Sequence, residues 1–184
     1  MADGGSGPGE GWLVLIYRVP SEPSRLRSAV WRRLKSLGAI YLQNSAAALP
    51  AGPGAERAMR KLRSQILDMG GTAALLSARL LAGEPEVRAA FQAARNDEYE
   101  EIVDRCEDFL AQVKKEHVAE HFTFAELEEN EVDLVKLQNW FARVRDRDVF
   151  GAEGRQAVEA ALATCEESLE GYAARVYAEE ADIH

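Results

Sequence analysis

The sequence contains few of the residues that mark secreted, membrane-bound or disulfide-rich proteins. It has only two cysteines in 184 residues, Cys106 and Cys165, and their wide separation supports neither a disulfide framework nor a Cys-x-x-Cys metal site. No apolar run approaches the ~20 residues of a membrane-spanning helix. Residues 1–10, MADGGSGPGE, lack the basic and apolar regions of a signal peptide, and their composition predicts a disordered tail. These absences predict a cytoplasmic protein with reduced thiols and no membrane partner.

Motifs of the common catalytic and nucleic-acid-binding folds are also missing. There is no glycine-rich phosphate loop, no GxSxG nucleophile motif and no Ser/His/Asp arrangement. A helix-turn-helix, a zinc finger and an aromatic RNA-binding signature are equally missing. Function therefore has to be sought in the distribution of charge and in polar residues at core positions.

Charge divides the chain into two halves. Residues 1–83 hold 11 Lys and Arg against 5 Asp and Glu, whereas residues 84–184 hold 11 against 26. The overall net charge of -9 therefore combines a basic first half with a strongly acidic second half. Such asymmetry predicts two surfaces with different partners, or halves that attract each other.

Residues 11–82 alternate strand-like and helix-like patterns. Gly38 and the pair Gly70-Gly71 follow apolar helical stripes at positions suited to helix ends. The expected elements are a strand at 12–17, a helix from Ser24 to 37, a hairpin at 39–49 around Asn44-Ser45, a helix at 55–69 and a strand at 72–81. This order predicts an α+β fold, namely a ferredoxin-like βαββαβ domain with two helices on one face of an antiparallel sheet.

Residues 84–182 contain no strand-like pattern and predict a three-helix bundle. The first helix is expected from Pro85 to about His121, with a break near Asn96-Asp97. Thr123 and Glu126 form a capping box that opens a second helix ending near Arg147. The last helix carries apolar residues at alternating spacings of four and three, as in a bundle seam.

Basic residues gather on the two helices of the first half. Arg25, Arg32 and Lys35 share one face because they are separated by close to whole turns, and Arg27 and Arg33 flank them. Such a patch is an electrostatic footprint for phosphate backbones, although a solvated outer face has the same appearance. The predicted DNA-binding residues are Arg25, Arg32, Lys35, Arg57, Arg60 and Lys61.

Polar residues on the apolar stripes of the bundle predict a second site. His117 and His121 lie four residues apart, so both imidazoles can face one point, as a transition metal or haem requires. Glu98 and Glu131 fall on or beside the same stripes, and a buried carboxylate needs a partner or a metal. The alternative is that the histidines lie exposed at a helix end and that the carboxylates pair with arginines such as Arg95.

The segment from Trp140 to Asp148 predicts a third candidate. Arg143 and Arg147 lie one turn apart, and their guanidinium groups match the geometry of a tetrahedral oxyanion. Alternating charge at a helix end also arises from local ion pairs alone. A small oxyanion effector is therefore a candidate partner.

Two stretches resemble a known family. WLVLIYRVPSEPSRLRSAVWRRLKSLGAIYLQNSAAALP and HFTFAELEENEVDLVKLQNWFARVRDRDVFGA resemble the N-terminal domain of ChrB, the chromate-resistance regulator. The resemblance covers about residues 11–180, and the first half is also similar to the ferredoxin-like middle domain of PaaX-type repressors. It implies a cytoplasmic bacterial protein linked to a transcriptional response to chromate or a related stress. The resemblance also implies a second, C-terminal domain in full-length family members, and the residues that resemble the family match only the first domain.

The leading hypothesis is a ChrB-like regulatory protein that binds DNA and responds to an oxyanion. The alternative is a haem- or metal-dependent enzyme that uses the bundle, with His117 or His121 as a ligand and Glu98 or Glu131 as a general acid or base. A homodimer formed through the sheet is a third hypothesis.

Overall fold

The computed structural model describes residues 11–183 and contains two compact units. The described part of unit 1 comprises residues 11–94 and 147–151, and that of unit 2 comprises residues 95–146 and 152–183. The predicted tail at residues 1–10 lies outside the described residues. Helix α3 (Glu84–Val118) contributes its first turns to unit 1, so the units divide beyond the domain boundary predicted near residue 83.

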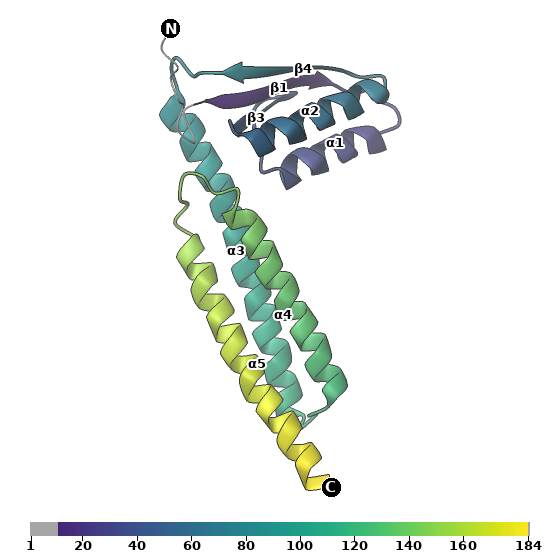
Figure 1. Ribbon diagram of the computed structural model, residues 1–184, viewed down its shortest axis with the longest axis vertical. Helices are drawn as coiled ribbons and strands as arrows, with labels where there is room; N and C mark the ends of the chain where they lie inside the picture. The colour runs from purple at the N-terminus through teal and green to yellow at the C-terminus, as the bar shows by residue number, and fades with distance from the viewer. Residues whose placement is uncertain (1–10, 184) are drawn as a thin grey trace. The chain divides into compact units, whose positions relative to one another are not determined.

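Unit 1 is a four-stranded antiparallel sheet with two helices on one face (Figure 1). The strand order β2-β3-β1-β4 and the βαββαβ element order confirm the predicted ferredoxin-like fold. The elements are β1 (Trp12–Arg18), α1 (Arg25–Ser36), β2 (Ile40–Gln43), β3 (Ala46–Pro50), α2 (Pro53–Asp68) and β4 (Thr72–Ala78).

The core of unit 1 lies between the helices and the sheet. Helix α1 buries Val30 and Leu34, because these residues are four apart on its apolar face. Helix α2 adds Met59, Leu62 and Ile66 at spacings of three and four. Gly38 has a φ of 76°, which confirms the predicted left-handed helix stop. Ser24 occupies the N-cap position, but its side chain makes no capping hydrogen bond.

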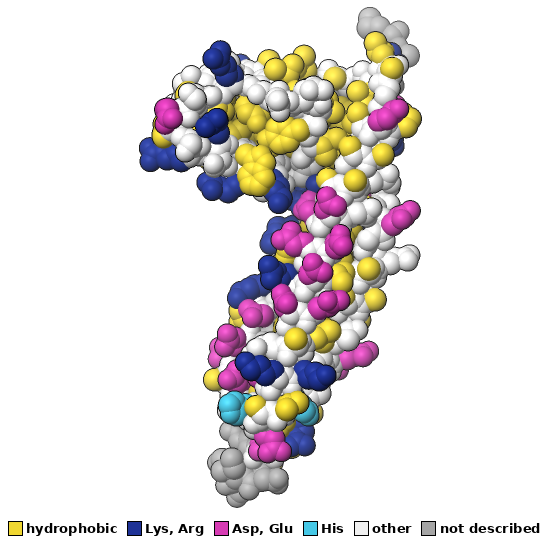
Figure 2. Space-filling view, turned by 180° about the vertical axis from the view of Figure 1, so that it is seen from behind, with side chains coloured by type: hydrophobic (Ala, Val, Ile, Leu, Met, Phe, Trp, Pro, Cys, Tyr) yellow, Lys and Arg dark blue, Asp and Glu magenta, His cyan; other side chains and the backbone are white. Residues whose placement is uncertain are grey.

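The opposite face of the sheet is covered only at one end. Trp12 packs there against Phe91 and Phe150, with ring centroids 6.2 and 5.9 Å away. Farther along the same face, Ile16 is 51% exposed and Leu76 is 42% exposed. Figure 2 shows this face of the sheet as a largely apolar surface.

Unit 2 is formed by three long helices that share one apolar core. They are the second part of α3, α4 (Phe124–Arg145) and α5 (Arg155–Ile183). Thr123 Oγ1 accepts a hydrogen bond from the Glu126 N–H at 3.2 Å, which confirms the predicted cap of α4. The largest fully buried side chains include Tyr99 and Tyr172. No helix among residues 11–183 is long and apolar enough to span a membrane.

The boundaries of the bundle helices differ from the prediction in two places. Helix α3 continues through Asn96-Asp97 without the expected break. It ends at Val118, not near His121, because the chain turns at Glu120, which has a φ of 53°. The His121 N–H then donates to the Glu116 carbonyl, the six-to-one bond of a Schellman motif.

Candidate nucleic-acid interface

Helix α1 presents positive charge without compensating negative charge. Its sequence, RLRSAVWRRLKS, holds five basic residues and no acidic one. The predicted contacts Arg25, Arg32 and Lys35 are all exposed, and none of them forms an ion pair within residues 11–183. Their charge is therefore available to a partner.

Helix α2 adds three further cations. Arg57, Arg60 and Lys61 are exposed, as predicted. Arg60 pairs with Glu56 at 2.7 Å, but both side chains are open to solvent, so this pair contributes little stability and is easily exchanged. Arg57 and Lys61 form no ion pair within the described part of the chain.

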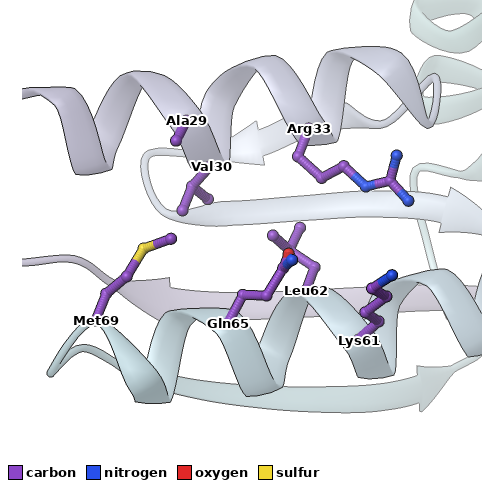
Figure 3. Close-up of a pocket in the computed structure, with 7 residues that line it drawn as sticks. All are labelled: Ala29, Val30, Arg33, Lys61, Leu62, Gln65 and Met69. Atoms are coloured by element: carbon purple, nitrogen blue, oxygen red, sulfur yellow. The ribbon is translucent and has the colours of Figure 1, made fainter.

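A groove of about 410 Å³ runs between α1 and α2. Buried Val30 and Leu62 form part of its apolar floor, whereas Arg33 and Lys61 point toward one another at one end (Figure 3). Arg33 was expected only to flank the basic face, and the structure places it at the groove. The full lining consists of Ala29, Val30, Arg33, Lys61, Leu62, Gln65 and Met69.

An exposed tryptophan lies among the cations of α1. Trp31 is 50% exposed, and the Lys35 ammonium lies 5.5 Å from the centroid of its ring. Sequence reasoning missed this residue, although the four-residue spacing of Arg27, Trp31 and Lys35 indicates one helix face. An aromatic surface beside cations can stack with a base or support an extended side chain.

The structure does not assemble the predicted oxyanion clamp on one helix. Helix α4 ends at Arg145, so Arg147 does not follow Arg143 by one turn of the same helix. Arg143 is exposed in unit 2. Arg147 belongs to unit 1, where its Nη1 donates to the Ser36 carbonyl at 2.5 Å, at the C-terminal end of α1. A guanidinium there interacts favourably with the helix dipole.

The predicted metal or haem residues do not form one cluster. Glu98 precedes His117 by nineteen residues on α3, a distance of about 28 Å along the helix. Glu98 instead pairs with buried Arg95 at 2.6 Å, as in the alternative interpretation. The predicted pairing of the histidines on one helix is wrong, because His121 lies beyond the end of α3.

The surroundings of the two histidines are open. His117 is exposed and packs edge-on against Phe122, with ring centroids 5.1 Å apart, and His121 is also exposed. No group of three or more His, Cys, Asp or Glu side chains placed to hold a metal occurs in residues 11–183. Haem ligation by a single histidine stays a prediction.

The carboxylate buried in the bundle is Glu116, not Glu131. Glu131 is exposed, and Asn130 occupies the core position beside it. The Asn130 and Gln112 side-chain amides each donate to Glu116 at 2.6 Å. Glu116 was detectable from its spacing of three from Val113 on the α3 stripe.

This buried cluster also affects Tyr172 of α5. Burial raises the pKa of the Tyr172 hydroxyl, and the negative charge of Glu116 adds to the effect. The protonated hydroxyl donates to the His121 carbonyl. Glu116, Asn130 and Tyr172 therefore come from three different helices and lie near the end of unit 2 at which α3 ends and α4 begins.

The two cysteines are both free and buried in the bundle core. The Cys165 thiol donates to the Cys106 carbonyl at 3.6 Å. Burial, followed by the neighbouring Cys106, raises the pKa of Cys165 to about 12, and burial also raises the pKa of Cys106. Both side chains are therefore protonated at neutral pH and serve as small apolar core residues.

Comparisons with known proteins support the resemblance inferred from the sequence. The family described as "Protein ChrB, N-terminal" matches residues 27–183. The chain is also 28% identical over 138 residues to Protein ChrB of Cupriavidus metallidurans. That alignment covers 74% of this chain and 42% of the relative, so the chain spans about two fifths of the relative's length. The chain therefore belongs to the family of ChrB N-terminal domains.

Proposed function

We propose that this chain is a regulatory protein of chromate resistance that binds DNA through the α1–α2 face and responds to a small oxyanion. Membership in the ChrB N-terminal family supports a regulatory role. The observation that carries DNA binding is the concentration of exposed cations on α1 and α2 without matching carboxylates. The contacting residues are Arg25, Arg32, Lys35, Arg57, Arg60 and Lys61, with Arg33 added from the structure.

Phosphate backbones are the natural partner for such a face. Each phosphate neutralised by Lys or Arg releases condensed counterions, which drives association without sequence-specific contacts. Glu56 is the only carboxylate that forms an ion pair with these cations within residues 11–183, and that pair is exposed. Binding DNA therefore requires little loss of internal ion pairing.

The test is a titration of fluorescently labelled duplex DNA with the full chain at several salt concentrations. Seven phosphate contacts predict a slope of about -6 for log K against log salt. Replacing Arg32→Glu and Arg60→Glu together should weaken binding by at least about tenfold. The control Arg105→Glu changes an exposed residue of unit 2 and should leave affinity nearly unchanged.

Two results would count against DNA binding through this face. One is affinity that does not fall with salt, because the proposed contacts are electrostatic. The other is an equal loss in the Arg105→Glu control, because that result would reflect total charge and not the α1–α2 face.

The groove between α1 and α2 supports the oxyanion response. Arg33 and Lys61 come from different helices and approach the same end of the groove, so one oxyanion can contact both. A bound oxyanion there would neutralise part of the phosphate-binding face. Chromate binding and DNA binding are therefore expected to oppose each other.

Thermal unfolding with and without chromate, at constant ionic strength, tests this response. Chromate should raise the melting temperature, and the double replacement Arg33→Gln with Lys61→Gln should abolish the increase. Arg143→Ala tests the clamp predicted from the sequence. If chromate no longer raises the melting temperature of this variant, the anion binds at Arg143 and not in the groove. No shift in the parent chain would reject oxyanion binding.

A further inference from the structure

The two edges of the sheet in unit 1 differ in how well they are protected. Edge strand β2 has four residues, and its pairing with β3 shifts register between Tyr41 and Gln43. Edge strand β4 has seven residues, TAALLSA, in unbroken register with β1. It contains no charged residue and no proline, which are the usual devices against strand addition.

The hydrogen bonds of β1 determine which backbone N–H and carbonyl groups of β4 point away from the sheet. The Tyr17 N–H donates to the Ser45 carbonyl, so Tyr17 directs its backbone groups away from β4. Because backbone direction alternates along an antiparallel strand, Ile16 faces β4 and pairs with Ala74. The N–H and carbonyl groups of Ala73, Leu75 and Ser77 therefore point outward. Among residues 11–183, no strand pairs with this side of β4.

A groove of about 480 Å³ lies beside this edge. Arg60, Arg63 and Ser64 of α2 form one side, and residues 73–75 of β4 form the other. Arg63 Nε donates to the Ala73 carbonyl at 3.1 Å, so one outward carbonyl already has a donor. The outward groups of Leu75 and Ser77 extend beyond that contact.

An added strand would meet different chemistry on its two faces. Side chains directed toward the helices would lie beside Arg60 and Arg63, which favours carboxylates. Alternate side chains, directed toward the other face of the sheet, would continue the apolar surface that includes Ile16 and Leu76. An extended segment that alternates acidic and apolar residues therefore matches both faces.

We propose that the outer edge of β4 binds an extended peptide segment of a partner protein by strand addition. Main-chain hydrogen bonds to Leu75 and Ser77 supply affinity, and acidic side chains opposite Arg60 and Arg63 supply specificity. A second copy of this chain fits less well: antiparallel pairing of two β4 strands would bring the arginines of both copies to one interface, and like charges there disfavour association.

The test uses fluorescence anisotropy of a labelled synthetic peptide that alternates glutamate with valine, titrated with the full chain. A lysine–valine peptide and an N-methylated glutamate–valine peptide serve as controls, because they reverse the charge or remove the N–H donors. The glutamate–valine peptide alone should bind. Arg63→Glu should weaken its binding by roughly tenfold, whereas Arg57→Glu, on the same helix outside the groove, should not.

A second variant tests the backbone hydrogen bonds without changing any charge. Ser77→Pro removes an outward N–H, and the bonds between β4 and β1 are retained because the Ser77 N–H does not face β1. It should abolish peptide binding while the melting temperature changes little. Because the proposed DNA contacts lie on α1 and α2 and none lies on β4, Ser77→Pro should leave DNA affinity unchanged, which separates this proposal from the proposed function.

Four outcomes would overturn the proposal. Equal binding of the glutamate and lysine peptides would remove the role of the arginines, and undiminished binding of the N-methylated peptide would remove strand addition. Sedimentation showing a dimer that Ser77→Pro dissociates would identify a second copy as the occupant. Absence of binding by the glutamate–valine peptide, in a chain whose β4 is protected from hydrogen exchange, would reject the site.

Discussion

Unit 1 and unit 2 differ in the sign of their charge and in where that charge is placed. The described part of unit 1 has thirteen Lys and Arg against six Asp and Glu, and that of unit 2 has nine against 23. The cations of unit 2 largely pair with carboxylates three or four residues away on their own helix, as Arg105, Lys136 and Arg175 do. Those of α1 have no such neighbours. The cations of α1 in unit 1 are therefore available to partners, whereas those of unit 2 mainly form ion pairs within their own helices.

The cores of the two units also differ in their content of buried polar residues. The buried polar residues among those described are Arg95, Glu116 and Asn130, and all three belong to unit 2. Unit 1 has an apolar core and instead leaves one sheet face and one strand edge partly open. Unit 1 therefore leaves apolar and backbone groups open at its surface, whereas unit 2 holds buried polar groups that can specify how its helices pair.

The largest expected effect tests whether the two cores are separate. Tyr99→Ala removes a fully buried ring of unit 2, which packs near Phe141 and Gly154, and should cost about 3–5 kcal/mol in the free energy of unfolding. Hydrogen exchange measured by mass spectrometry should show lost protection in α4 and α5, with β1 and β3 still protected. Equal loss in both units would show that they unfold as one.

A second prediction concerns the polar core of unit 2. Glu116→Ala leaves the buried Asn130 amide without its carboxylate acceptor and should destabilise the chain by about 2–3 kcal/mol in urea unfolding. Glu107→Ala, at an exposed position of the same helix, should change stability by less than about 0.5 kcal/mol. Similar values for the two variants would mean that the buried polar group does not specify the bundle.

A third prediction concerns backbone packing in unit 1. A Cβ at Gly71 would lie 2.4 Å from the Arg18 carbonyl oxygen and 2.8 Å from Ile66 Cγ2, so Gly71→Ala should cost about 1–3 kcal/mol. Gly54→Ala, in α2 with no atom within 4 Å of the added Cβ, should instead stabilise the chain by about 0.5–1 kcal/mol. The two melting temperatures should shift in opposite directions; a shift of the same sign would contradict the packing argument.

The effect that is smallest at neutral pH is a pH dependence to which Cys165 of unit 2 contributes. Cys165 has a folded-state pKa of about 12, raised from 9.0, so the folded chain retains a proton that the unfolded chain releases between these values. The free energy of unfolding should therefore fall as pH rises from 9 toward 12, by at most about 1.4 kcal/mol per pH unit from this group. Urea unfolding of the parent and Cys165→Ala should show a weaker dependence in the variant. Identical dependence would assign it to other groups.

Local periodicity predicted most of the fold, and long-range contacts limited the prediction of the site. The strands, helices and glycine stops of unit 1 follow from short patterns, as Gly38 illustrates. The prediction of a buried Glu131 is wrong by one residue, because Asn130 occupies the core position and each residue of a helix is rotated by about 100° from the one before it. The turn at Glu120 uses a non-glycine left-handed residue, for which the sequence carries little signal.

The placement of Arg147 shows why the predicted clamp was not recoverable from sequence. Its partner, the Ser36 carbonyl, lies 111 positions earlier in the chain, and no local pattern connects the two. The exposed cations, in contrast, were predictable because a helix with basic residues and no acidic ones has no internal means of neutralising them. Patterns within one helix were informative, and pairings between distant segments were not.

The burial of both cysteines has a consequence for redox chemistry. Oxidation of a thiol requires access and thiolate character, and Cys106 and Cys165 are fully buried with raised pKa values. These are the only cysteines in the sequence. An oxidising anion that meets the folded chain therefore finds no accessible cysteine thiolate, and a response of this chain to such an anion is expected to rest on reversible binding and not on the transfer of electrons from cysteine to the anion.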